Sequence, residues 1–204
     1  MKKFGFMILV GGLLVFALTG CGKAKDNAGQ GAAGGEAGNA QQAVTVDVAD
    51  ATELLTKVWS SYEEAERFPS SGGDFDNIVS DAPGKFDVSK AEDLDAVLGL
   101  PQDSAKLIDD AASLMHMMNA NTFTAGAYHL QDGAQLQTLA DALKDNIMNR
   151  QWMCGFPDTL IVAKVGGEYV VSAFGNAEII ENFKNKLSET FTVTDIDYEE
   201  SLTE

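Results

Sequence analysis

Residues 159–174 read TLIVAKVGGEYVVSAF, and this stretch decides the fold class. Two apolar runs, 159–165 and 168–174, flank the dipeptide Gly166-Gly167. Valine, isoleucine and aromatic residues favour strands, and the two glycines supply the positive φ angles that a two-residue hairpin needs. The stretch therefore predicts an antiparallel β-hairpin.

A second strand pair and two helices are predicted around this hairpin. Residues 113–119 and 122–130 have strand composition, with the turn at Asn119-Ala120-Asn121. A helix opening at Asp132 or Gly133 has one apolar face, and a closing helix capped by Asn176 has another. These faces comprise Leu136, Leu139, Ala140, Leu143 and Ile147, and then Ile179, Ile180, Phe183 and Leu187. The order ββαββα predicts an α+β fold with a four-stranded antiparallel sheet and its helices on one face.

The flanking segments complete the predicted domain. Residues 44–110 are predicted as an N-terminal helical section, because Asp50 and Glu53 have the spacing of a capping box ahead of an apolar stripe. We expect this section to form one unit with the α+β domain, residues 111–190. Residues 191–204 begin with strand-like alternation and continue as an acidic C-terminal tail.

The N-terminus has the pattern of a bacterial lipoprotein signal. Lys2 and Lys3 precede an apolar run over residues 4–17, and Leu18-Thr19-Gly20-Cys21 reads as a lipobox. We expect residues 1–20 to be removed between Gly20 and Cys21, and a diacylglyceryl group to be attached to the Cys21 thiol. The apolar run is shorter than the ~20 residues of a spanning helix. The sequence therefore predicts a cell-membrane lipoprotein, lipid-anchored on the extracytoplasmic face.

Residues 21–43 link this anchor to the domain. Residues 22–43 contain no large apolar side chain, so they cannot bury enough surface to offset their ordering entropy. As a random coil they would hold the domain about 25 Å from the lipid. We expect a flexible Gly/Ala-rich tether that keeps the domain near the membrane.

The net charge of the chain limits the classes of partner that it can bind. The sequence has 14 Lys and Arg against 31 Asp and Glu, and removal of Lys2 and Lys3 would leave a net charge of −19. Nucleic-acid binding depends on basic side chains that neutralise phosphates, so nucleic acid is excluded as a partner. We expect contact with the membrane through the lipid on Cys21.

Several segments of the chain resemble a family of small lipoproteins from Gram-positive bacteria. The resemblance lies in residues 122–128 (TFTAGAY), 133–134, the Leu136 helix, 150–152 (RQW) and 166–171 (GGEYVV), and extends to the closing helix. That family carries domain of unknown function 4358. The resemblance supports the predicted order of strands and helices and the predicted extracytoplasmic location, and implies no activity or site residues.

The segment Trp152-Met153-Cys154-Gly155-Phe156-Pro157 is the candidate docking loop. Trp and Phe are frequent interface anchors, so Trp152 and Phe156 are the predicted partner-docking residues. The alternative is a loop tucked over the core. Cys154 is expected to be buried and inert, because only Arg150 offers the positive charge that activates a thiol.

No metal, cofactor or catalytic site is predicted. Met115-His116-Met117-Met118 offers ligands that suit Cu(I), but alternation along a strand keeps the four side chains from converging. Clustered acids such as Asp74 with Asp76, and Asp195 with Asp197, lack the order of a calcium loop and are expected to be a solvated face. His116 and His129 could become neighbours across a turn, yet no catalytic motif accompanies them.

These observations predict a non-catalytic interaction domain that binds another envelope protein or a wall-associated ligand. The alternative is a small-ligand or divalent-cation binding lipoprotein that is accessory to transport. The sequence predicts that the protein is not an enzyme.

Overall fold

A computed structural model describes residues 45–153 and 155–203. The strands are β1 Ser70–Gly72, β2 Val79–Ser80, β3 Gly84–Lys85, β4 Ile108–His116, β5 Phe123–Leu130, β6 Thr159–Val165, β7 Tyr169–Gly175 and β8 Thr194–Ser201. The helices are α1 Ala51–Ser60, α2 Ala91–Asp93, α3 Leu136–Met148 and α4 Ala177–Thr190, and α2 runs on into a π-helical turn, η2, Leu94–Leu98. The 3₁₀ turns are η1 Glu64–Glu66, η3 Gln102–Leu107, η4 Ala120–Thr122 and η5 Gly133–Gln135.

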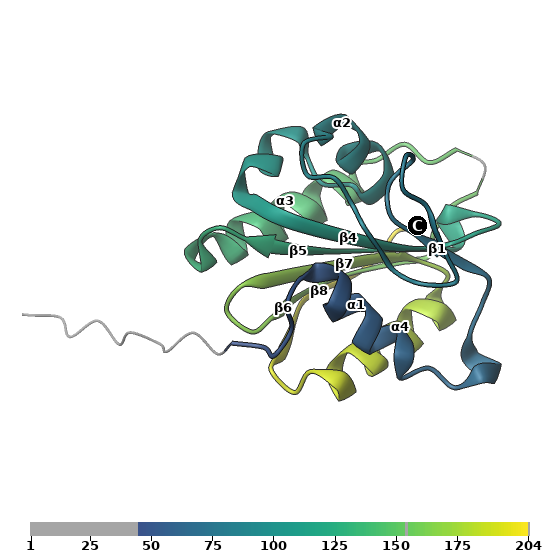
Figure 1. Ribbon diagram of the computed structural model, residues 1–204. Coiled ribbons are helices and arrows are strands. Elements are labelled where there is room, and N and C mark those ends of the chain that lie inside the picture. Colours follow the sequence, from purple (N-terminus) through teal and green to yellow (C-terminus); the bar gives the residue numbers. More distant parts are fainter. Residues whose placement is uncertain (1–44, 154, 204) are drawn as a thin grey trace, which may run out of the picture. The chain divides into compact units, whose positions relative to one another are not determined.

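One antiparallel sheet of eight strands organises the domain (Figure 1). Its order is β2-β1-β4-β5-β7-β6-β8, with β3 also paired to β4. The α+β class is therefore confirmed, while the prediction of four strands is wrong. The sequence pattern had identified β4 to β7 and missed β1, β2 and β3, which are too short for a periodicity to be detected.

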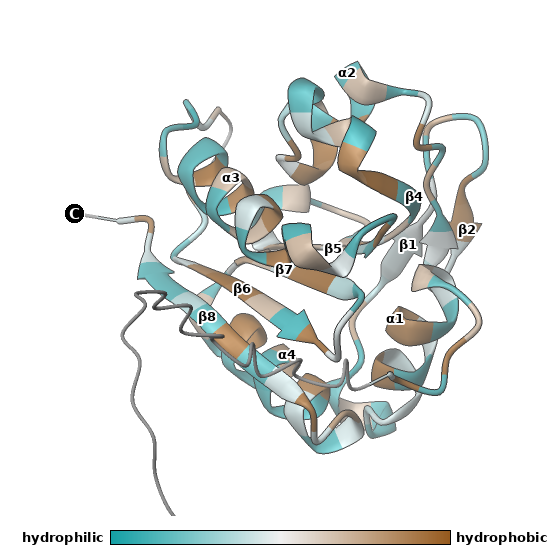
Figure 2. Ribbon diagram, turned by 90° about the vertical axis from the view of Figure 1, so that its left-hand side faces the viewer, coloured by the Kyte–Doolittle hydropathy of each residue, from teal (hydrophilic) through white to brown (hydrophobic). Residues whose placement is uncertain are grey.

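The central strands are buried on both faces, and this places helices on both sides of the sheet. In β6, Ile161, Ala163 and Val165 belong to the core on the side of α1 and α4, whereas Leu160 and Val162 belong to the core on the side of α3 and η2. Figure 2 shows α3 on one side of the strands and α1 and α4 on the other, and the buried apolar residues of these helices belong to the two cores. The prediction that helices lie on one face is wrong, because nearly continuous apolar strands need cover on both faces.

The N-terminal section contributes to both the sheet and the core. Asp50 accepts a hydrogen bond from the amide of Glu53 at 2.7 Å, which confirms the predicted N-cap of α1. Leu54, Leu55 and Val58 of this helix are fully buried. Residues 44–110 were predicted to be helical, yet three of the strands lie wholly between Ser70 and Lys85.

Two local predictions need correction at the ends of strands. The β6–β7 hairpin pairs Val165 with Tyr169, so its loop has three residues rather than two, with Gly166 at φ +63°. The expected acidic tail contains β8, which pairs along the whole of β6. Lys164 pairs with Asp197 at 2.9 Å, and this ion pair lets an acidic strand lie against an apolar one.

Candidate functional site

The predicted lipidation site lies outside the described residues. Cys21 and Gly20 belong to residues 1–44, so lipid attachment and signal cleavage stay predictions. Cys154 also lies outside the described residues. Among the residues that the structure describes, no helix is long and apolar enough to cross a membrane.

A groove of about 480 Å³ opens at the end of the sheet where β4 finishes. Its walls come from β1, η2, the β4–β5 turn, the loop after α3 and β7. The lining residues are Ser71, Phe75, Ala96, Val97, Met115, His116, Met117, Met118, Asn119, Ala120, Asn121, Arg150, Gln151, Trp152, Met153 and Phe174. The groove thus brings together two segments that lie far apart in the sequence, the Met115–Met118 run and the loop containing Trp152.

Trp152 is half-buried in this groove. Its ring centroid lies 5.1 Å from that of Phe174 in β7, and it packs against the core on the α3 side of the sheet. The Arg150 guanidinium lies over the same ring, 5.3 Å from its centroid. Trp152 therefore lies over the core, as the alternative reading of the loop expects, and does not project into solvent.

Arg150 ties the loop after α3 to the π-helical turn η2. One guanidinium nitrogen, Nη2, donates to the carbonyl of Asp95 at 2.8 Å and also to the carbonyl of Ala96. Burial lowers the pKa of Arg150 from its usual value, because a buried guanidinium loses solvation. The two carbonyls belong to the last four residues of the continuous helix that α2 and η2 form, residues 91–98, and a cation is favoured at that end of a helix.

Phe156 has a different environment from Trp152. Its side chain is 70% exposed, over a neighbouring polar depression formed in part by Asn119, Asn121 and Asp158. The Asn121 side-chain amide donates to the carbonyls of Met153 (3.0 Å) and Gly155 (2.9 Å). The β4–β5 turn thereby fixes the loop, so Phe156 is held outward while Trp152 faces inward.

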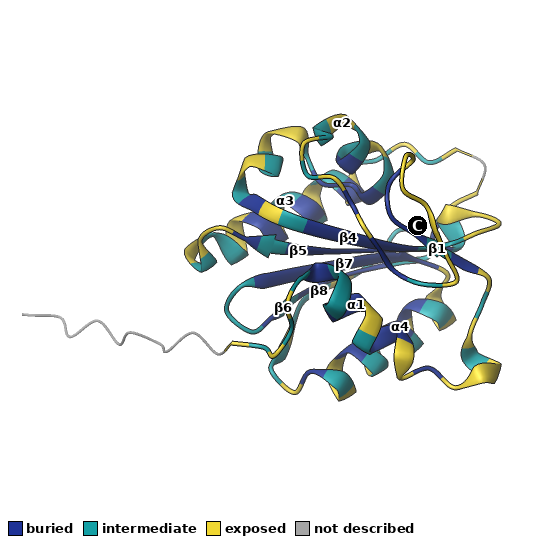
Figure 3. Ribbon diagram, viewed as in Figure 1, coloured by how far each residue is buried: buried dark blue, intermediate teal, exposed yellow. Residues whose placement is uncertain are grey.

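Exposed apolar side chains gather around the groove, and we call this set the apolar rim. Its members are Phe75 (66% exposed), Ile78 (67%), Met117 (49%), Met118 (79%), Met153 (79%) and Phe156 (70%). They come from three loops, and adjacent depressions with shared lining residues connect them into one surface. Figure 3 shows exposed loops at this end of the sheet, beside the label of β1.

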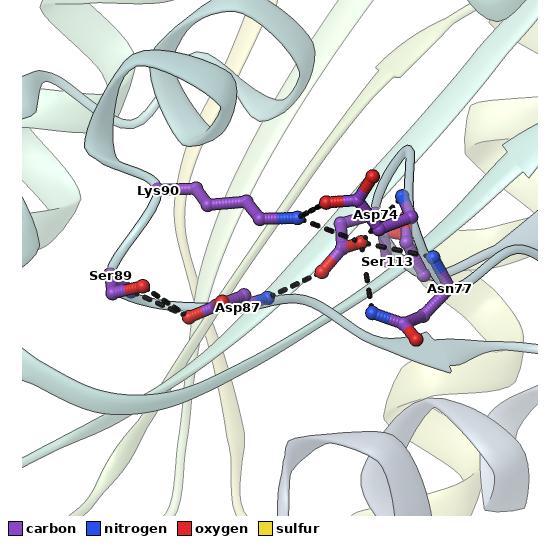
Figure 4. Close-up of polar contacts among 8 residues, drawn as sticks. Asp74, Asn77, Asp87, Ser89, Lys90 and Ser113 are labelled. Atoms are coloured by element: carbon purple, nitrogen blue, oxygen red, sulfur yellow. Dashed lines mark hydrogen bonds and ion pairs between the residues drawn. The ribbon is translucent and has the colours of Figure 1, made fainter.

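A buried carboxylate holds the first of these loops in place (Figure 4). Asp74 is only 3% exposed and accepts hydrogen bonds from the backbone amides of Asp76, Asn77 and Asp87. Lys90 pairs with Asp74 at 3.2 Å. Burial alone would raise the pKa of Asp74, but the hydrogen bonds from Asp76, Lys90 and Asp87 lower it overall. The loop that presents Phe75 and Ile78 is therefore anchored at several points.

The two histidines lie at opposite ends of the β4–β5 strand pair. His116, at the end of β4, stacks on Phe68 at 5.4 Å. His129 pairs with Asp109 at 2.6 Å near the start of β4, so the two histidines are not neighbours. Among residues 45–153 and 155–203, no group of three or more His, Cys, Asp or Glu side chains is arranged to hold a metal ion.

The C-terminal acids are divided between two lysines. Asp195 and Asp197 lie near Lys164, at 3.8 and 2.9 Å, whereas Glu199 pairs with Lys184 of α4 at 2.8 Å. A register shift opposite Val162 and Ala163 interrupts the alternation of β8. Strict alternation along an extended tail would put Asp195, Asp197 and Glu199 on one face, and the register shift instead divides them between the two faces.

Comparisons with known proteins add no relative. No protein-family model, no curated protein and no solved structure matches the chain. The resemblance to lipoproteins with domain of unknown function 4358 therefore stays a prediction.

Proposed function

We propose that this protein is a membrane-anchored extracytoplasmic lipoprotein whose folded domain is a non-catalytic interaction module. Cys21 would carry the lipid, and the domain would bind another envelope protein through the apolar rim. The observation that carries the proposal is the rim itself, six large apolar side chains held outward by three loops.

The design of the loops supports a binding surface. Soluble monomers rarely expose large contiguous apolar patches, and such patches mark interaction sites. Methionine and aromatic residues are enriched at protein interfaces, and five of the six rim residues are of these types. Asp74 and Asn121 fix the loops before a partner arrives, so little conformational entropy is lost on binding.

The position of the rim suits a tethered domain. The amide of Ala51, the first residue of α1, donates to Asp110 at 2.8 Å, near the start of β4. The groove lies at the other end of β4, beside His116. Six residues of strand separate these ends by roughly 20 Å. The rim therefore lies away from the point where the N-terminal chain joins α1.

Photo-crosslinking in the native host tests the docking role. A photoreactive residue would replace Met118 or Phe156 in the rim, and Glu64, an exposed residue in η1, would be the control position. We expect both rim positions to capture the same envelope protein and Glu64 to miss it. Unrelated proteins at the two rim positions, or the same protein from all three positions, would contradict the proposal.

The anchor has its own test. Cys21→Ser should abolish incorporation of labelled fatty acid and move the protein from the membrane fraction to the soluble fraction. Retention of a lipid label on the Cys21→Ser variant would contradict lipidation at this residue.

A further inference from the structure

Arg150 has an environment that the proposed docking role does not explain. Among the described residues, seven of the ten Lys and Arg side chains make ion pairs with carboxylates, which are Lys57, Lys85, Lys90, Lys144, Lys164, Lys184 and Lys186. In the same part of the chain Arg150 makes none, although the sequence has 31 acidic residues. The other two, Arg67 and Lys106, are exposed, whereas Arg150 is half-buried and its hydrogen bonds go to backbone carbonyls.

The acid nearest along the wall of the groove is already engaged elsewhere. Asp95 gives its backbone carbonyl to Arg150, but its carboxylate accepts a hydrogen bond from Asn146 of α3 at 2.9 Å. The recorded hydrogen bonds of Arg150 both use Nη2. A guanidinium has five N–H donors, so several remain for a ligand.

Of the sixteen residues that line the groove, Arg150 included, ten are apolar and the rest are polar or charged. Val97, Met115, Trp152 and Phe174 line the same groove. Its volume of about 480 Å³ lies within the range of small-molecule sites, which are mostly apolar with a few convergent polar groups. Methionine side chains adapt their shape, so they suit a flexible tail.

We propose that the groove binds a small amphipathic carboxylate, with a single apolar tail packed against Met115 and Trp152 and its carboxylate paired with Arg150. Arginine binds carboxylates through charge-assisted, often bidentate hydrogen bonds. A carboxylate carries one negative charge, whereas a phosphate monoester carries nearly two at neutral pH and meets greater repulsion from so acidic a chain. This site does not depend on a protein partner at the apolar rim.

Calorimetry with three probes of equal tail length tests the assignment. Decanoate, decanol and decyltrimethylammonium share a ten-carbon tail and differ in the charge of the head. Residues 45–203 enclose their own core on both faces of the sheet, so the chain from Gly22 can be used without lipid or detergent. We expect decanoate to bind at least fivefold more tightly than decanol, and the cationic probe to bind most weakly.

Substitution of Arg150 distinguishes the contribution of the charged head group to binding from that of the apolar tail. Arg150→Gln should reduce decanoate binding to the level of decanol, and Arg150→Lys should retain most of the preference and show that the fold survives. The control is Arg67→Gln, because Arg67 also lies over a tryptophan, Trp59, at 5.6 Å, but outside the groove. We expect this control to bind all three probes as the unmodified chain does.

Two results would overturn the inference. One is equal binding of decanoate and decanol, which would mean that Arg150 does not select the head. The other is no measurable heat from any probe at two well-separated temperatures, since the heat-capacity change of apolar burial gives bound probes a heat at one of them; this would mean that the groove takes no single-tailed ligand. Neither result bears on capture of a protein at Met118 or Phe156, so failure here is distinguishable from failure of the docking role.

Discussion

Replacement of Asp74 by alanine should destabilise the domain and loosen the loop that carries Phe75. The carboxylate accepts three backbone amides, the side-chain amide of Asn77 and an ion pair from Lys90. Alanine would remove the acceptor of the Asp76 and Asp87 amides in a site where only 3% of Asp74 is exposed. The Asn77 amide keeps the backbone carbonyl of residue 74, and Lys90 keeps Asp76.

The size of the effect follows from these contacts. A hydrogen bond to a charged group contributes about 1.5–3 kcal/mol, and part of the loss is recovered where the freed amides reach water. Asp76, Asn77 and Asp87 are exposed residues, so we expect a total loss of about 2–3 kcal/mol rather than a sum over all bonds. For a domain of this size, that lowers the melting temperature by roughly 5–10 °C.

Asp76→Ala is the matched control. Asp76 pairs with the same lysine, Lys90, at 2.5 Å, but its side chain is 77% exposed. Exposed ion pairs contribute little, so the control should lose less than about 0.5 kcal/mol. The measurement is urea denaturation at neutral pH, followed by tryptophan fluorescence. Equal unfolding midpoints for Asp74→Ala and Asp76→Ala would refute the reasoning.

The pH dependence gives a second check on the same residue. The pKa of Asp74 is lowered in the folded state, so its ionised form stabilises the fold above the unfolded pKa of about 3.9. This stabilisation is lost as the pH falls through the folded pKa. The stability difference between the unmodified chain and Asp74→Ala should therefore be constant near neutral pH and shrink in acid. A difference that persists unchanged in strong acid would contradict an electrostatic role.

Three further outcomes are expected. All four tyrosines have raised pKa values, mainly by burial for Tyr62, Tyr128 and Tyr169 and mainly by the hydrogen bond to Asp141 for Tyr198. The folded state should therefore keep its full stability below pH ~10 and lose it above that pH, where the tyrosines of the unfolded chain ionise. Phenolate absorbance should rise together with unfolding, and a rise in the intact fold would contradict this. Gly72→Ala would place a methyl group 2.5 Å from the carbonyl of Ser113 and closer still to the amide of Gly84, so denaturation should show a loss of about 3 kcal/mol; an unchanged midpoint would refute the tight packing. Leu143→Ala and Phe183→Ala empty fully buried positions on opposite faces of the sheet, and each should cost about 3–4 kcal/mol within a single cooperative transition; two separate transitions would show that the faces unfold independently.

The parts of the fold with strong periodicity could be predicted from the sequence. The apolar faces of α3 and α4, the strands of the β6–β7 hairpin and the N-cap Asp50 were all identified from spacing and residue type. Such elements depend on local patterns. The number of strands does not, because β1, β2 and β3 have two or three residues each and exist only by pairing with distant partners.

A signal for helices on both faces was present in the sequence. Six of the seven residues of β7 are apolar or glycine, without the alternation of a strand that faces water on one side. A continuous apolar strand of this kind indicates that helices cover both faces of the sheet. Strand β8 is hard to recognise from the sequence because it is rich in acidic residues, and an acidic strand at the edge of a sheet resembles a solvent-exposed tail.

The candidate site could be predicted only in pieces. Trp152, Phe156 and the Met115–Met118 run were selected for their residue types, but nothing local indicates that they surround one groove. Phe75 and Ile78 lie among acidic residues with neither helical nor strand periodicity, which indicates exposed apolar residues in a loop. The role of Arg150 depends on contacts across more than fifty residues, which no spacing rule reports.

The position of β8 affects how copies of this protein would behave when crowded. The strand is the last element among the described residues, and it pairs along β6, whose residues Leu160 to Ala163 and Val165 are all buried. A chain that ended before Thr194 would leave that apolar strand open to a neighbour, and open edges of this kind drive aggregation. The lipid anchor proposed at Cys21 would hold copies of the protein on one membrane surface, where the like charges of the outer strands would keep them apart.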